Sequence, residues 1–100
     1  MKRVEVILTQ AIESDFMVYY TAACKSLGVK PKMTQIPGVM GQGNTSPKMG
    51  DPVWPQLNTM FIIFCDEKTV DAISKIMAQL HKEYAGEGAA AFVSDAGELI

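Results

Sequence analysis

Arginine is almost absent from this chain, and its scarcity limits the partners that the protein can bind. Arg3 is the only arginine, and nine basic residues stand against eleven acidic ones, which gives a formal net charge of -2. Binding of a polyphosphate backbone depends on clustered lysine and arginine side chains. We therefore expect no nucleic-acid partner.

The chain also has no long hydrophobic run. None of its apolar segments approaches the ~20 residues that a membrane-spanning helix needs. The alternating N-terminal segment breaks at Gln10 and has neither the apolar centre nor the cleavage site of a secretory signal. Cys24 and Cys65, the two cysteines, fall in segments expected to be buried, where free cysteine acts as a small hydrophobe; a disulfide or redox pair is the alternative. We expect a cytoplasmic protein.

Residues of the types that commonly catalyse reactions or bind metals are also few. His81 is the only histidine, and its place beside the apolar stripe of a predicted helix favours a surface or interface role over metal binding. Acidic residues gather where helices are expected to begin, and the helix dipole explains them. They are Glu13, Asp15, Asp66, Glu67 and Asp71. Once these acidic residues are set aside, no pair of a nucleophile and a base remains, so we expect a protein without enzyme activity. A soft-metal site from Met40 and Met49 across subunits is the metal-binding alternative.

Apolar residues, by contrast, are plentiful and regularly placed. They make up 48% of the 100 residues, which is typical of one packed domain, here spanning 1–100. Period-two alternation and β-favouring runs predict four strands. The predicted strands are 2–9, 32–39, 58–66 and 89–93. Helical spacing predicts one helix capped by Ser14 and ended at Gly28, and a second capped by Asp66 and ended by Gly86 and Gly88.

This element order predicts an α+β, ferredoxin-like βαββαβ fold with an antiparallel sheet on two helices. Pro37 cannot donate to a ladder, so the second strand should lie at an edge. In the third strand Met60, Ile62 and Phe64 are expected to face the helices. Phe61, Ile63 and Cys65 would then face away and be covered by other copies in a closed homo-oligomer, unless the tail or the long loop folds over them.

The connection at 39–57 is too long for an ordinary loop and is expected to be functional. Its glycine cluster at 41–44 brings flexible backbone amides together, and Trp54 between two prolines offers an amphipathic ring to a partner. A second cluster, at 86–88, precedes the last strand. If neighbouring subunits brought the two clusters together, they would line a cleft whose amides favour an anion. The alternative is a mobile loop whose tryptophan packs on its own base.

Several motifs, in this order and spacing, resemble the PII signal-transduction family over essentially the whole chain. "MKRVEVIL" is similar to the family's opening strand, and "GVMGQGN" to the base of its T-loop, with Gly38 and Gln42 matching. "VDAISKIM" is similar to its second helix, and "GEGAAAFV" to its B-loop and following strand. The resemblance implies a homotrimer that binds small-molecule effectors in inter-subunit clefts, with the T-loop acting on a membrane transporter or an enzyme.

The resemblance also assigns residues to these roles. Effector binding would fall to Gly38, Gly41, Gln42, Gly43, Gly86, Glu87 and Gly88, and partner binding to a loop carrying Lys48 and Trp54. The family has basic residues where this chain has Gly41, Gly43 and Ala89, so an adenine nucleotide would bind without the usual phosphate contacts. The loop has no tyrosine for uridylylation. "MGDPVWP" is similar to shorter loops near heavy-metal efflux systems, so a metal-binding or efflux-associated protein, or a non-sensing interaction module, is the alternative function.

Overall fold

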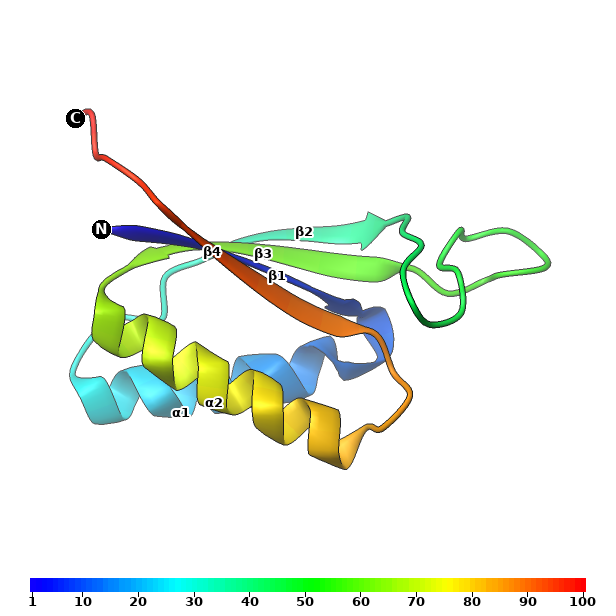
Figure 1. Ribbon diagram of the computed structural model, residues 1–100, viewed down its shortest axis with the longest axis horizontal. Coiled ribbons are helices and arrows are strands. Elements are labelled where there is room, and N and C mark those ends of the chain that lie inside the picture. Colours follow the sequence, from blue (N-terminus) through cyan, green and yellow to red (C-terminus); the bar gives the residue numbers. More distant parts are fainter.

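The computed structural model describes residues 1–100 as a four-stranded antiparallel sheet with both helices on one face (Figure 1). The strands are β1 (Lys2–Thr9), β2 (Thr34–Val39), β3 (Asn58–Cys65) and β4 (Ala89–Asp95). The helices are α1 (Glu13–Leu27) and α2 (Glu67–Glu83), with a short 3-10 turn, η1 (Gln10–Ile12), before α1. The spatial strand order is β2-β3-β1-β4. The predicted ferredoxin-like fold is confirmed.

Strand β2 lies at one edge of the sheet, as Pro37 predicted. Its pairing with β3 is interrupted between Ile36 and Val39, where the register shifts. Gly38 occupies this irregularity with a φ of 67°, a conformation that favours glycine. The irregularity ends the regular ladder where the long connection begins.

Of the four assigned helix ends, those at Asp66 and Gly28 are confirmed, while α2 ends at Glu83 with Tyr84 as its cap, before Gly86. Asp66 accepts hydrogen bonds from the backbone N–H and the hydroxyl of Thr69, at 2.9 and 2.8 Å, and Gly28 leaves α1 in the left-handed conformation. The Ser14 cap is wrong. Ser14 lies inside the first turn of α1, because η1 already starts the helical path and Ile12 precedes the helix without a side-chain cap.

The core lies between the helices and one face of the sheet, called here the inner face. Val4 and Val6 of β1 lie opposite Ile63 and Phe61 of β3, so all four project toward the helices. Phe16 of α1 lies against Phe61, with ring centroids 4.9 Å apart. The second helix adds its predicted stripe. Its buried apolar members are Ile73, Ile76, Met77 and Leu80.

The predicted facing of β3 is wrong. Phe61 and Ile63 are 0% and 1% exposed in the core, so they cannot be the oligomer interface that the sequence suggested. The reason is that β3 is apolar at nearly every position, and its composition does not select a face. The alternation of β1 selects it, through the pairing of Val6 with Phe61 and Val4 with Ile63.

An uncovered apolar surface is nevertheless present, built from other residues. The side of the sheet away from the helices, called here the outer face, carries Met60, Ile62 and Phe64 of β3. Phe64 and Phe92 are 48% and 61% exposed. The helices lie on the opposite side (Figure 1). The expectation of a largely apolar, uncovered face therefore survives the correction of its residues, although Arg3 and Glu5 of β1 also lie on this face and Arg3 lies over the Phe64 ring.

The inner position of Phe61 predicts a large loss of stability on truncation. Phe61→Ala should lower the free energy of unfolding by about 3–5 kcal/mol, because it leaves a cavity under Phe16. Urea denaturation followed by circular dichroism measures the change. Val18→Ala, at a position 65% exposed on α1, is the control and should change stability by less than about 0.5 kcal/mol. A Phe61→Ala protein as stable as this control would contradict the assignment.

The Asp66 cap predicts a pH dependence. Hydrogen bonds donated by Thr69 lower the pKa of the Asp66 carboxyl below its ordinary value of 3.8. Because the folded pKa is depressed, the carboxylate contributes stability above pH 3.8, and that contribution is lost as the pH falls through the folded pKa. Asp66→Ala should therefore destabilise the protein at neutral pH and make a smaller difference in strong acid. Denaturation midpoints measured under both conditions test this, and equal differences would contradict it.

Candidate functional site

The connection between β2 and β3 is folded into two parts, and the first is the pocket lobe (residues 41–48). It is closed by backbone pairing of Gly41 with Lys48, whose two N–H···O=C bonds are both 2.8 Å. It also reaches the segment before β4: a Cβ atom added to Gly88 would lie 3.1 Å from the Thr45 hydroxyl oxygen. The pocket lobe is therefore a closed loop that lies against the start of β4.

The second part is the tip lobe (residues 50–56), which extends beyond the end of the sheet (Figure 1). Gly50 donates to the carbonyl of Gln56 at 3.2 Å and closes its base. The Asp51 carboxylate accepts from the backbone N–H groups of Val53 and Trp54, at 3.0 and 2.6 Å. This side-chain turn gives the tip an internal structure, and Trp54 remains 41% exposed on it. Whether Trp54 contacts a partner stays a prediction.

Leu57 joins the tip lobe to the sheet. Its side chain lies so close to Gly50 that a Cβ atom there would come within 2.9 Å, and Gly50 has a φ of 68°. The same side chain lies 3.8 Å from the Cβ position of Gly38. The Leu57 carbonyl accepts from the backbone N–H of Gln10 at 3.0 Å. Gly38 therefore supports the loop base and does not line the pocket.

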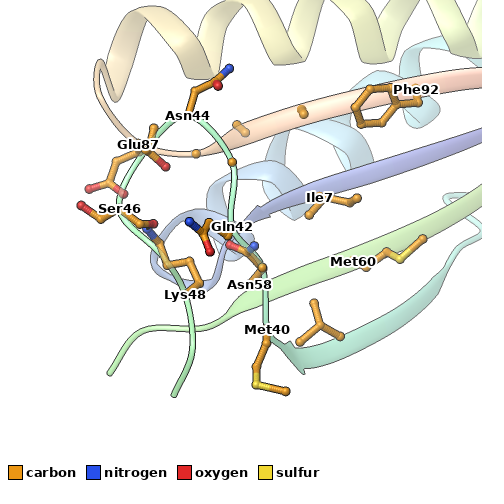
Figure 2. A pocket seen from close by; sticks show the side chains of 17 residues that line it. Ile7, Met40, Gln42, Asn44, Ser46, Lys48, Asn58, Met60, Glu87 and Phe92 are labelled. Carbon is orange, nitrogen blue, oxygen red and sulfur yellow. The ribbon is translucent and has the colours of Figure 1, made fainter. Parts of the chain in front are cut away.

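A pocket of about 600 Å³ lies between the pocket lobe, the outer face of the sheet and the segment before β4 (Figure 2). Its floor is apolar and includes Ile7, Met60 and Phe92. Its walls are mostly neutral amides and hydroxyls. They come from Gln42, Asn44, Thr45, Ser46 and Asn58. An apolar floor with a few polar groups above it is typical of small-molecule sites.

The structure brings most of the predicted effector residues together. Gly41, Gln42 and Gly43 line the pocket from one side, and Glu87 and Gly88 from the other. Gly86 does not line it and serves as a turn with a φ of 89°. The sequence placed the two clusters on neighbouring subunits, but here one chain supplies both. The Thr9 N–H donates to the Gly88 carbonyl at 2.9 Å, which holds the second cluster at the end of β1.

Lys48 is not on the exposed surface of the loop, where a partner-binding residue would lie. Its side chain is in the wall of the pocket and the residue is only 4% exposed. Its ammonium donates to the Ser46 carbonyl at 2.8 Å. The backbone pairing of Lys48 with Gly41 turns it inward, and a pairing between irregular loop residues leaves no periodic pattern in the sequence.

Sequence reasoning also missed Asn58 and the apolar floor. The Asn58 amide nitrogen lies 2.5 Å from the Cβ position of Gly41, so a larger residue at 41 would displace it. Phe92 is an outer-face residue of β4, and only the strand register shows that it shares this face with Met60 and Ile7. The only sequence signal for Phe92 was its place in the strand that follows the second glycine cluster.

The soft-metal alternative from Met40 and Met49 across subunits stays a prediction, because it concerns residues of several copies. No group of three or more histidine, cysteine or acidic residues is close enough to hold an ion. His81 is exposed on α2, as expected, with its Nε2 atom 2.6 Å from the carbonyl oxygen of Ala89. Met40 is 70% exposed and Cys24 is in the core. Neither helix of the structure is apolar and long enough to cross a bilayer.

Solved structures of the same architecture place the fold in a known group. CPII from Thiomonas intermedia K12, bound to ADP and bicarbonate, superposes with a TM-score of 0.64 at 20% identity, covering 93% of this chain and 82% of CPII. This chain has the PII-like fold. A second CPII structure, described as a nitrogen regulatory PII-like protein bound to ADP, AMP and bicarbonate, gives a TM-score of 0.67 with the same identity and coverage.

A third PII-like structure agrees. A Thermus thermophilus protein described as a PII-like signaling protein superposes on this chain with a TM-score of 0.55 at 20% identity, covering 93% of this chain and 83% of that one. Neither a protein-family model nor a curated relative matches the sequence. The likeness to PII-like proteins is thus one of fold.

The position of Leu57 predicts the effect of a change at Gly50. Gly50→Ala would adopt a left-handed φ and push its Cβ against Leu57, so the tip lobe should detach at a cost of about 1 kcal/mol or more. Trp54 is the only tryptophan, so acrylamide quenching of its fluorescence measures the detachment. Quenching should rise in Gly50→Ala and not in Gly97→Ala, whose Cβ would meet open space. Equal quenching in both would contradict the role of Leu57.

Proposed function

We propose that this chain is a PII-like regulatory protein that binds a small-molecule effector in the pocket and signals its occupancy through the loop at 39–57. The observation that carries the proposal is that the loop itself builds one wall of the pocket. A ligand that contacts this wall has different affinities for different loop conformations. It therefore changes the loop's conformational population, which a partner can detect.

The class of effector is narrowed by the pocket and by the related structures. CPII binds ADP, AMP and bicarbonate, and a pocket of about 600 Å³ with an apolar floor and amide walls can hold a nucleoside. Lys48 is the only basic residue of the wall, and Glu87 adds a negative charge. We therefore expect an adenine nucleotide with few phosphates, or bicarbonate, rather than a triphosphate.

The protein is proposed to act as a homotrimer. The outer face exposes Phe64 and Phe92 and is continuous with the pocket floor, because Phe92 belongs to both. A neighbouring copy that covered this face would bury an apolar surface and close the open side of the pocket. Pockets in the assembly would then lie next to inter-subunit contacts, as the PII resemblance implies.

The tip lobe is the proposed contact for a partner, such as a cytoplasmic segment of a membrane transporter. Val53 and Trp54 expose apolar surface between Pro52 and Pro55. The Asp51 turn holds both residues, so little conformational entropy is lost when they bind. We infer a cytoplasmic, non-catalytic protein that acts through this contact.

Ligand binding is tested by thermal shift and by Trp54 fluorescence with ADP, AMP and sodium bicarbonate. An effector at about 100 times its Kd should stabilise the protein by about 2.7 kcal/mol. It should also change Trp54 emission, since Leu57 and the backbone pairing of Gly41 with Lys48 connect the tip to the pocket. Trp54→Phe should keep the thermal shift and lose the optical signal. The proposal fails if none of these ligands shifts the unfolding temperature.

The outer face is tested by charge insertion. Phe64→Asp and Phe92→Asp should convert the trimer to monomers, because each places a carboxylate in an apolar interface. Light scattering coupled to size-exclusion chromatography gives the mass. Val18→Asp, exposed on the opposite side of the molecule, is the matched control and should leave the trimer intact. Monomeric wild-type protein, or intact trimers of both Phe variants, would count against the proposed interface.

A further inference from the structure

Lys48 is a buried cation without a counter-ion. The residue is 4% exposed, although lysine is rarely buried without a charged partner. The three ion pairs of the chain involve Lys2 and Arg3 and leave Lys48 out. Its ammonium can donate three hydrogen bonds and has one acceptor within the protein, the Ser46 carbonyl at 2.8 Å. The unused donors of this ammonium face the pocket, where water or an anion can meet them, and only an anion also offsets the charge.

The surroundings show where such an anion would come from. Lys48 lines the pocket together with Ser46, and Figure 2 shows its side chain on the wall below Ser46 and Glu87. Glu87 is exposed and forms no ion pair with it. The remaining polar wall residues are uncharged. A ligand in the pocket is therefore the available source of negative charge for the ammonium.

We infer that Lys48 is the anchor for a single oxyanion group of the effector, such as one phosphate or one carboxylate. This inference rests on the proposed function, because it concerns the same pocket. One cation matches one oxyanion. A polyphosphate would place further negative charge near Glu87 and the neutral amides, where no second cation offsets it.

The anchor also connects the effector to the fold of the loop. The same residue that meets the oxyanion pairs its backbone with Gly41, and this pairing closes the pocket lobe. An anion that binds the ammonium where this pairing holds it stabilises the paired lobe relative to a lobe in which the Gly41–Lys48 pairing is broken. Effector binding therefore favours the closed lobe, which is the differential affinity that a loop-based signal requires.

The test compares ligands that differ in one oxyanion. Isothermal titration at constant ionic strength with AMP, adenosine, ATP and sodium bicarbonate should show AMP or bicarbonate binding, with adenosine and ATP each roughly tenfold or more weaker than AMP if AMP binds. Binding of AMP assigns the oxyanion to a phosphate, and binding of bicarbonate alone assigns it to a small inorganic anion. Lys48→Met should weaken either ligand by about tenfold or more.

Two further measurements separate an anchor from a structural residue. Lys48→Met removes a buried charge at similar volume, so the ligand-free variant should melt at or above the wild-type temperature. Lys48→Gln keeps a donor for the Ser46 carbonyl but no charge, and it should also lose oxyanion binding. Lys75→Met, exposed on α2, is the matched control and should bind like the wild type.

The outcomes distinguish this inference from the proposed function. If the wild type binds adenosine as tightly as AMP, or if Lys48→Met and Lys48→Gln both keep full affinity, the anchor is wrong while the effector pocket stands. A ligand-free Lys48→Met protein that melts well below the wild type would make Lys48 a structural residue and overturn the inference. If the wild type binds none of the four ligands, both the inference and the effector proposal fail.

Discussion

Two backbone hydrogen bonds at the end of the central strand β1 hold the pocket end of this molecule together. Thr9 donates to the Gly88 carbonyl, which fixes the segment before β4, and Gln10 donates to the Leu57 carbonyl, which fixes the end of the long connection. These bonds need no particular side chain at either residue. They place two segments that are far apart in sequence on either side of one strand end, and the pocket is the space that results.

The sequence predicted the architecture because its periodic signals are strong. Alternation in β1, the stripe of α2 and the cap at Asp66 each follow a local rule, and the observed elements obey it. No local rule predicts which face of the sheet Phe61 lies on. A strand that is apolar on both sides takes its orientation from the partner strand, so the orientation depends on β1–β3 pairing rather than on β3 itself.

The candidate site was predictable only to the level of glycine clusters. Gly41 to Gly43 and Gly88 could be singled out because glycine allows a close backbone approach, and the structure uses Gly41 and Gly88 for close approach to Asn58 and Thr45. The burial of Lys48 could not be predicted, because it follows from one bridge in a segment without regular structure. The sequence position of a charged residue in a glycine-rich loop does not indicate whether its side chain faces water.

In the proposed homotrimer, the outer face and the pocket would share part of one surface. Phe92 lies on both surfaces, so a copy that covers the outer face also limits access to the pocket floor. Apolar contact would supply most of the assembly energy, while the polar walls and Lys48 would supply selectivity. Because the apolar floor belongs to the sheet and most of the polar wall to the loop, a bound ligand could alter the loop while the sheet contacts stay in place. The proposed trimer would then remain assembled while the loop changes conformation.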